Sequence, residues 1–154
     1  MTKKIFKSNI LVAVVVLIFG IACVMAILYQ HFGKQIDTEL KKEATYLAYG
    51  VEQNGMDYLN QIKEKDDRIT YIAEDGTVLY DNQADSSSME NHSDRKEIQE
   101  ALKSGSGRAE RDSKTLSQKT IYYALRLSDN TVLRVSSTQY SVWVLLMEMV
   151  PPII

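Results

Sequence analysis

An uncharged apolar run from Ile10 to Tyr29 constrains this chain more than any other feature of its sequence. A helix that spans a membrane needs about 20 apolar residues, because each residue advances the helix by about 1.5 Å and the hydrocarbon core is about 30 Å thick. The run has this length and carries no charged side chain. We therefore expect residues 10–29 to form a transmembrane helix, preceded by a short tail at residues 1–9.

A second apolar segment extends from Val142 to Ile154, with Glu148 as its only charged residue. This segment is shorter than a spanning helix requires. We expect residues 142–154 to be the truncated start of a second transmembrane helix. The chain between the two segments, residues 30–141, is then one domain that is attached to a membrane at both ends.

Three lysines predict the orientation of this domain. Lys3, Lys4 and Lys7 precede the first apolar run within a short tail. Basic residues next to a transmembrane helix are retained on the cytoplasmic side. We expect a cytoplasmic N-terminus and an extracytoplasmic domain at residues 30–141.

The composition excludes several classes of function. The chain has 18 basic and 20 acidic side chains, a balance that does not favour a nucleic-acid partner. Cys23 is the only cysteine and lies in the first apolar run, so the outer domain has no disulfide and no thiolate metal site. The sequence contains no GxSxG, HExxH or Walker motif. We expect no catalytic residues and no cofactor in this chain.

An amphipathic helix is predicted to follow the first apolar run. Apolar residues recur at intervals of three and four, and no proline separates them from the transmembrane helix. This stripe consists of Ile36, Leu40, Ala44, Leu47 and Val51. We expect one continuous helix that ends near Asn54-Gly55 and a short helical patch after it. The stripe is a candidate surface for a homodimer, and it must also cover the sheet.

From Arg68 the pattern changes to that of strands. The β-branched and aromatic runs at residues 68–73 and 77–81 flank an Asp-Gly pair, which predicts a hairpin. A short helix is expected from Asp94, with Asp94 and Glu97 as a capping box, to Gly105. Further strands are expected at residues 108–112, 119–127 and 132–137. The fold class is α+β, with a long N-terminal helix on an antiparallel sheet.

Several segments together resemble the extracytoplasmic Cache or PDC sensor, a PAS-like domain, of phosphate-regulon-type bacterial sensor histidine kinases. The resemblance rests on RITYIAEDGTVLYDN, MENHSDRKEIQEAL, a Ser-Gly-rich link, IYYALRL, VLRVSS, and SVWVLL followed by Pro151-Pro152. It extends over nearly the whole chain. The expected fold is a PAS-like antiparallel sheet with the long helix on one face and short helices on the other.

The resemblance implies a signalling role in a bacterial cell membrane. Such a kinase phosphorylates a cognate response regulator, but this sequence contains no phosphoacceptor histidine box and no ATP lid. The chain as given is therefore expected not to be an enzyme, although its intact parent is expected to be a histidine kinase. Two alternatives remain open: the sensor region of a chemoreceptor or diguanylate-cyclase receptor, and a stand-alone membrane adaptor.

The charge pattern leaves the signal open. Acidic residues predominate from Glu74 to Glu100 and basic residues from Lys103 to Arg134. The simplest interpretation is two solvated faces; a second is a site for a small anion, because arginine offers a bidentate fork to carboxylate or phosphate. The resemblance implies a ligand between the sheet and residues 81–102, and some such domains respond to partner proteins instead. The candidate ligand-binding residues are His92, Arg95, Tyr71, Tyr123, Arg126 and Arg134.

A third interpretation is a site for divalent cations, because hard cations take carboxylate oxygens. Its candidate ligands are Asp81, Asp85, Glu90 and Asp94. Each residue also has a structural interpretation: His92 as a helix cap, Arg95 as a partner of Glu90 or Glu97, and the tyrosines as core.

Overall fold

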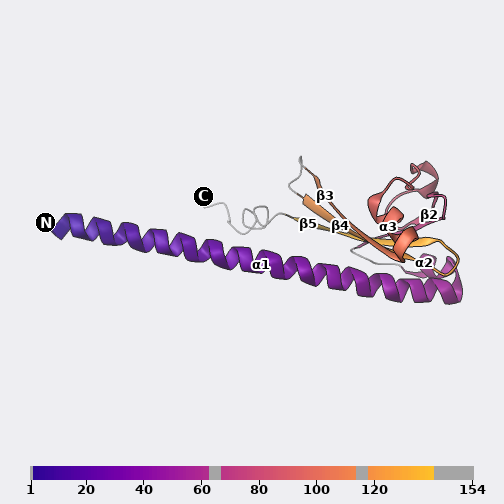
Figure 1. Cartoon of the computed structure of the whole chain (residues 1–154), viewed down its shortest axis with the longest axis horizontal. Coiled ribbons are helices and arrows are strands. Elements are labelled where there is room, and N and C mark those ends of the chain that lie inside the picture. The colour runs from indigo at the N-terminus through magenta and orange to yellow at the C-terminus, as the bar shows by residue number, and fades with distance from the viewer. Residues whose placement is uncertain (1, 63–66, 114–117, 141–154) are drawn as a thin grey trace. The chain divides into compact units, whose positions relative to one another are not determined.

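The computed structural model describes residues 2–62, 67–113 and 118–140 (Figure 1). The chain divides into two compact units, residues 1–36 and residues 37–154. The first unit consists of the N-terminal part of helix α1, Thr2–Asn54. Among the described residues, α1 is the one helix long and apolar enough to cross a membrane by length and composition; its most apolar window has a mean hydropathy of 3.3. The second span predicted at residues 142–154 lies outside the described residues.

The second unit is built on one five-stranded antiparallel sheet, in the order β2-β1-β5-β4-β3. Its strands are β1 (Arg68–Ile72), β2 (Val78–Asp81), β3 (Ser106–Ser113), β4 (Gln118–Arg126) and β5 (Val132–Tyr140). The Asp-Gly pair joins β1 to β2 as predicted, and Gly76 adopts a φ of 89°, which favours glycine. The predicted α+β class and its sequence of elements are confirmed, with β3 and β5 longer than expected.

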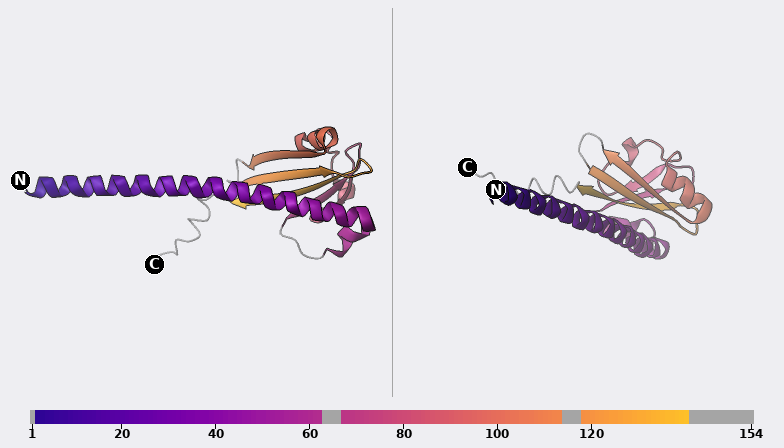
Figure 2. Two further views of the ribbon diagram at one scale, coloured as in Figure 1. Left: turned by 60° about the horizontal axis from the view of Figure 1, so that its bottom comes forward. Right: turned by 60° about the vertical axis from the view of Figure 1, so that its left-hand side comes forward.

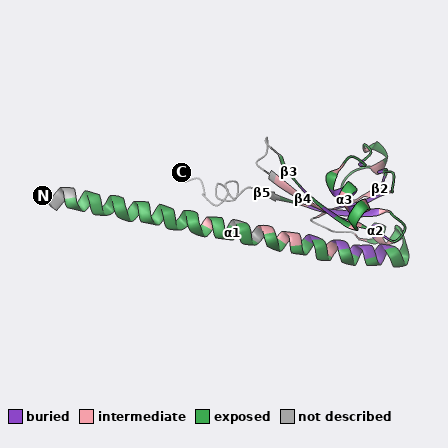
Figure 3. Cartoon of the chain, viewed as in Figure 1, coloured by how far each residue is buried: buried purple, intermediate pink, exposed green. Residues whose placement is uncertain are grey.

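Helices cover the two faces of this sheet (Figure 2). The part of α1 after residue 36, followed by α2 (Asp57–Gln61), lies on one face. Helix α3 (Lys96–Ser104) and the 3-10 turn η1 (Ser86–Ser88) lie on the other. Figure 3 shows the buried stripe of α1 beside the sheet.

The α1 stripe covers the sheet, as expected from the sequence. Leu40, Leu47 and Val51 are buried within the chain itself, with exposed fractions of 4% or less. Alternation along β1 and β5 presents Ile69, Leu133 and Val135 to α1, and all three are fully buried. The stripe is the core of the domain and is not available to a second copy.

A second core lies under α3 and contains Ile72, Val78, Ile98, Ala101, Ala124 and Val132. Helix α3 approaches β3 so closely that a Cβ at Gly107 would lie 1.9 Å from the backbone oxygen of Glu97. Only glycine permits this approach. The helix ends at Gly105, which has a φ of 92°, as predicted.

The predicted capping box at the start of α3 is wrong. The residue at the cap position is Arg95, which makes no side-chain cap bond, and Asp94 instead forms an ion pair with Arg95 at 3.7 Å. Glu97 does not reach back to the helix start, because its carboxylate is bound by two arginines of the sheet. Stronger charged partners in the tertiary structure replace the local cap.

Candidate functional site

A group of charged side chains lies between α3 and the sheet. In the register of the sheet, Arg134 of β5 is opposite Thr70 of β1 and Ala124 of β4. Successive strand residues point to opposite faces. Ala124 packs in the core under α3, so Arg134 points toward α3 as well.

Glu97 of α3 lies at the centre of the group. Its Oε2 is 2.6 Å from Nη2 of Arg111 on β3, and its Oε1 is 3.3 Å from Nη1 of Arg134 on β5. Glu97 is fully buried, Arg134 is 4% exposed, and the Arg111 side chain is 33% exposed. We call Glu97, Arg111 and Arg134 the arginine–glutamate cluster.

The net pKa changes of the two arginines have opposite directions, although burial acts to lower both. Burial lowers the pKa of Arg134 from its usual value, and the negative charge of Glu97 opposes that change only in part. Burial is also the largest single influence on the pKa of Arg111 and acts to lower it, but the hydrogen bonds and charges of Glu97 and Tyr122 together outweigh burial, and the net change is upward. Glu97 therefore favours the charged form of both arginines.

A hydrogen-bond chain extends the cluster across the sheet. Nη2 of Arg134 donates to Oγ1 of Thr70 at 3.1 Å, and that hydroxyl donates to Oδ2 of Asp81 at 2.9 Å. Nε of Arg68 donates to both oxygens of Asp81, at 3.1 and 2.9 Å. Three strands are thereby connected through polar side chains on the face that α3 covers.

Tyr122 connects the cluster to a groove at the surface. The guanidinium carbons of Arg111 and Arg134 lie 4.2 and 5.3 Å from the centre of its ring, within the range of cation–π contacts. Tyr122 also lines a groove of about 560 Å³. The lining of the groove is polar and consists of Asp67, Arg68, Gln83, Thr120, Tyr122, Ser136, Ser137 and Thr138.

His92 and Arg95 lie beside the cluster, on the loop that precedes α3. The backbone amide of His92 donates to the carbonyl of Gly76 at 2.8 Å, which fixes this loop against the β1–β2 turn. His92 is 6% exposed, and burial lowers the pKa of its ring, with the positive charges of Arg134 and Arg95 acting in the same direction. Among the described residues, Nδ1 of His92, Nε of Arg95 and Nε of Arg134 are buried without a hydrogen-bond partner.

The structure brings together three of the six predicted ligand-binding residues. His92, Arg95 and Arg134 are close enough for the two arginines to affect the pKa of the histidine. Arg126 does not join them: its Nη1 donates to the carbonyl of Leu102 at 2.7 Å, at the end of α3. In that position Arg126 supports the helix C-terminus.

The two predicted tyrosines lie on the opposite face of the sheet. Tyr71 is paired with Leu133 and Tyr123 with Val135, one residue away from the positions that face α3. Tyr71 is 8% exposed and accepts a hydrogen bond from Thr131 at 3.0 Å. The structure places these tyrosines on the α1 face, so they do not share a site with His92.

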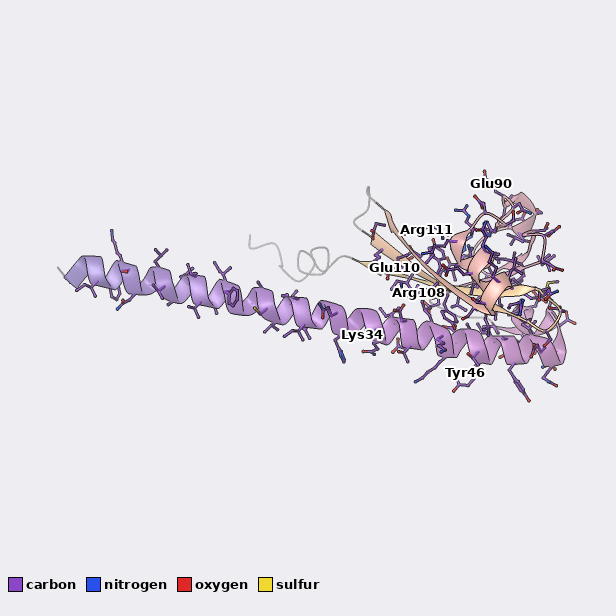
Figure 4. The ribbon with its side chains drawn as sticks, in the orientation of Figure 1. Lys34, Tyr46, Glu90, Arg108, Glu110 and Arg111 are labelled. Carbon is purple, nitrogen blue, oxygen red and sulfur yellow. The ribbon has the colours of Figure 1, made fainter. Side chains whose placement is uncertain are left out.

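The structure does not bring the four candidate cation ligands together into one group. Asp81 is bound by Arg68 and Thr70, and Asp85 accepts bonds from the backbone and hydroxyl of Ser87. Glu90 lies at the outer loop (Figure 4), and Asp94 is exposed beside Arg95. Residues 2–62, 67–113 and 118–140 contain no group of three or more metal-binding side chains close enough to hold an ion.

Sequence reasoning missed Glu97, Arg111 and Tyr122 as parts of the site. The sequence signal for Arg111 is its spacing from Ala109. Residues two apart on a strand point to the same face, and Ala109 is buried, so Arg111 is a charged residue at an inward position. Arg134 lies between Leu133 and Val135 and was found because of its charge. Glu97 was assigned to a local cap, which concealed its role in the cluster.

A known protein family matches most of this chain. The family model described as Single Cache-like matches residues 30–132. No curated protein matches the chain in sequence. The matched range includes α1 after the apolar run, Glu97 and Arg111 of the cluster, and the first four strands; Arg134 follows it on β5.

Proposed function

The chain belongs to the Single Cache-like family, and we propose that it is the extracytoplasmic sensing and transmembrane-signalling part of a two-component sensor histidine kinase. Cache domains are extracellular sensor modules typical of signalling proteins. An apolar N-terminal helix followed by such a domain is consistent with a membrane protein that has an extracellular sensor. In the proposed arrangement the N-terminus is cytoplasmic and the bacterial cell membrane is the site of action.

The observation that carries the proposal is the continuity of α1. One helix extends from Thr2 to Asn54 and contains both the apolar run and the stripe that packs on the sheet. A rearrangement between this stripe and the sheet therefore acts on the same helix that enters the membrane. Strand β5 ends at Tyr140, just before the second apolar segment in the sequence.

A signal has to bind one arrangement of the domain better than another. The buried Nε atoms of Arg95 and Arg134 support a small anion as that signal, because they are donors without acceptors in the described part of the chain. The response regulator is a partner only through a kinase core that follows this sequence. The chain itself is proposed to have no enzymatic activity and to act as a homodimer through a surface other than the α1 stripe.

The test is a fusion in which a donor kinase supplies its core and the rest of a second crossing after Ile154. We expect autophosphorylation of this fusion to change when the signal is added, and a fusion of residues 1–36 to the same donor parts to be unresponsive. Candidate signals are small carboxylates and phosphate. A fusion that folds, is phosphorylated and gives identical rates under all these conditions contradicts the proposal.

A chemoreceptor or diguanylate-cyclase receptor is the alternative, since membership of the Cache family is typical of signalling proteins in general. The sensing step would be the same and the output domain would differ. The amino-acid sequence that follows the second crossing in the parent protein distinguishes these outputs.

A further inference from the structure

His92 is the one histidine in the sequence of the second unit. The chain has two histidines, and the other, His31, belongs to the first unit. Histidine is the side chain whose ordinary pKa lies between about pH 5 and pH 8, and those of Asp and Glu lie about two units lower. Mild acidification of the medium therefore changes the charge of the second unit chiefly through His92.

Charged side chains of β1, β5, α3 and the loop before α3 act on the ring of His92. Arg134 of β5, Arg95 of the loop and Arg68 of β1 each oppose a positive charge on this ring. Glu97 of α3 favours such a charge, but its carboxylate already binds two arginines of the sheet. A protonated His92 would therefore add to positive charge that is not fully compensated.

Nδ1 of His92 is buried, and it has no hydrogen-bond partner among the described residues. In a protonated ring both nitrogens are donors, so Nδ1 would then carry a proton without an acceptor. Asp81, the carboxylate at the end of β2, is bound by Arg68 and Thr70. A buried charge without a partner is strongly unfavourable, so a protonated His92 favours an arrangement in which its ring meets water.

The loop that carries His92 is held against the β1–β2 turn by polar contacts. The amide of His92 donates to the carbonyl of Gly76 at 2.8 Å, and Nδ2 of Asn91 donates to the carbonyl of Asp75 at 2.9 Å. The two segments touch closely, since a Cβ at Gly76 would lie 2.4 Å from the backbone nitrogen of Ser93. The loop can leave this turn while the hydrogen bonds between the strands stay intact.

We propose that His92 is an acid-sensing switch: when its ring takes up a proton, residues 91–95 separate from the arginine–glutamate cluster and from the β1–β2 turn. This proposal rests on the proposed sensor function and adds the proton as a signal. The carbonyl of Arg95 accepts from the amides of Ile98 and Gln99, each at 3.0 Å, at the start of α3. Release of the loop therefore loosens the N-terminus of α3 as well.

The test is hydrogen exchange, resolved by residue, in the full chain in detergent at about pH 7 and about pH 5. Protection factors remove the intrinsic effect of pH on exchange. Because the pKa of His92 is lowered in the seated loop and ordinary in the released loop, the proton favours release below about pH 6.5.

We expect the protection of the His92 and Arg95 amides to fall by about tenfold or more at the acid value, because each unit below the ordinary pKa is worth a factor of ten. The amides of β5 that pair with β1 should keep their protection. Unchanged protection in the loop overturns the proposal. An equal fall in the loop and in β5 also overturns it, because His92 would then affect only global stability.

Two single-charge variants test the electrostatic cause. Arg95→Gln removes a cation that opposes the proton in the seated loop, so the acid-induced fall of the His92 amide should be smaller by about threefold or more. Lys96→Gln removes the next cation, which is 73% exposed and pairs with Glu100, and should give the same fall as the wild type. Equal falls in the two variants overturn the proposal.

His92→Gln removes the titrating ring, and its loop should have the same protection at both pH values. A fall equal to that of the wild type overturns the proposal. If His92→Gln does not fold, the comparison of Arg95→Gln with Lys96→Gln decides, because both retain the ring.

These exchange measurements do not depend on the kinase fusion. In cells, phosphorylation of the fusion should change when the medium is acidified, and the fusion of residues 1–36 controls for effects of pH on the donor parts. If the loop is released by acid while the fusion is unresponsive, the switch remains and the proposed output is refuted. If the fusion responds to a carboxylate or phosphate while the loop keeps its protection, the sensor role remains and the switch is refuted.

Discussion

Nε of Arg108 lies 2.7 Å from Oδ1 of Asp37, and this ion pair joins β3 to α1 at the first residue of the second unit. Arg108 also pairs with Glu110, which in turn pairs with Lys119 of β4. Arg111, next on the same strand, points to the other face and binds Glu97 (Figure 4). Strand β3 thus contacts α1 on one face and α3 on the other through charged side chains only three residues apart.

We predict that Asp37→Asn changes signalling far more than stability. Both side chains of the pair are more than one-third exposed, and exposed ion pairs contribute less than about 1 kcal/mol to stability. The fusion carrying Asp37→Asn should show altered basal phosphorylation with a nearly unchanged unfolding temperature. Lys42→Gln, which removes an exposed charge from the same helix, is the control and should behave like the wild type. Equal basal rates in all three proteins would refute a role for this pair in coupling.

Glu97 and Arg134 should show strong energetic coupling. Removing one member of a buried ion pair leaves the other charge uncompensated and costs about 3–5 kcal/mol. We expect Glu97→Gln and Arg134→Met each to destabilise the fold, and the double variant to lose less than the two single losses combined. The difference should be on the order of 1–3 kcal/mol by denaturant unfolding. Glu100→Gln is the matched control, and additive losses would show that the two residues act independently.

The stability of the domain should rise with pH in the range set by His92. Burial, with the charges of Arg134 and Arg95, lowers the pKa of His92 in the folded state, so the unfolded chain binds its proton more readily. The stability associated with neutral His92 is present above about pH 6.5, the ordinary histidine value. It is lost as pH falls below that value toward the lowered pKa.

This pH dependence is checked by unfolding temperatures of the wild type and of His92→Gln between about pH 5 and pH 8. The wild type should lose stability toward the acid end of this range, and His92→Gln should lose less. His31→Gln removes the other histidine and is the control. An identical pH profile for His92→Gln and the wild type would show that His92 titrates normally.

Gly107→Ala should displace α3 from the sheet. A methyl group at this position would lie 1.9 Å from the Glu97 carbonyl oxygen and 2.9 Å from the Ala101 amide nitrogen, which are both backbone atoms. Backbone cannot move aside as a flexible side chain can, so we expect a loss of at least about 1–3 kcal/mol, the usual cost of overpacking. Ser106→Ala, at the neighbouring exposed position, should leave the unfolding free energy within about 0.5 kcal/mol of the wild type. Equal stability of the two variants would contradict the close approach of α3.

The proposed topology predicts opposite labelling of two engineered cysteines. Cys23 is the only native cysteine, so Cys23→Ser provides a background without thiols. In that background Ser86→Cys should react with a membrane-impermeant thiol reagent in intact cells. Ser8→Cys should react only after the cells are lysed. Labelling of both positions, or of neither, in intact cells would contradict the proposed orientation.

Local patterns were enough to predict most of the elements. Helical spacing in α1, the Asp-Gly pair between β1 and β2, and Gly105 at the end of α3 each act over a few residues, so their effects are visible in the sequence. The cap at Asp94 was wrong because Glu97 has two possible partners. The Glu97 carboxylate can bind either the backbone at the start of its own helix or the arginines of the sheet. Only binding to the arginines gives the buried guanidinium of Arg134 a negative partner.

The sequence by itself determined the apolar helix, the α+β class and the order of the elements, because hydrophobic periodicity and turn residues operate along the chain. Only the tertiary structure decided which side chains share a site. The register of β5 places Arg134 toward α3 and Leu133 toward α1, and the register of β1 places Tyr71 on the face opposite Arg134. A shift of one residue would exchange the two faces, and pairing between strands distant in sequence sets that register.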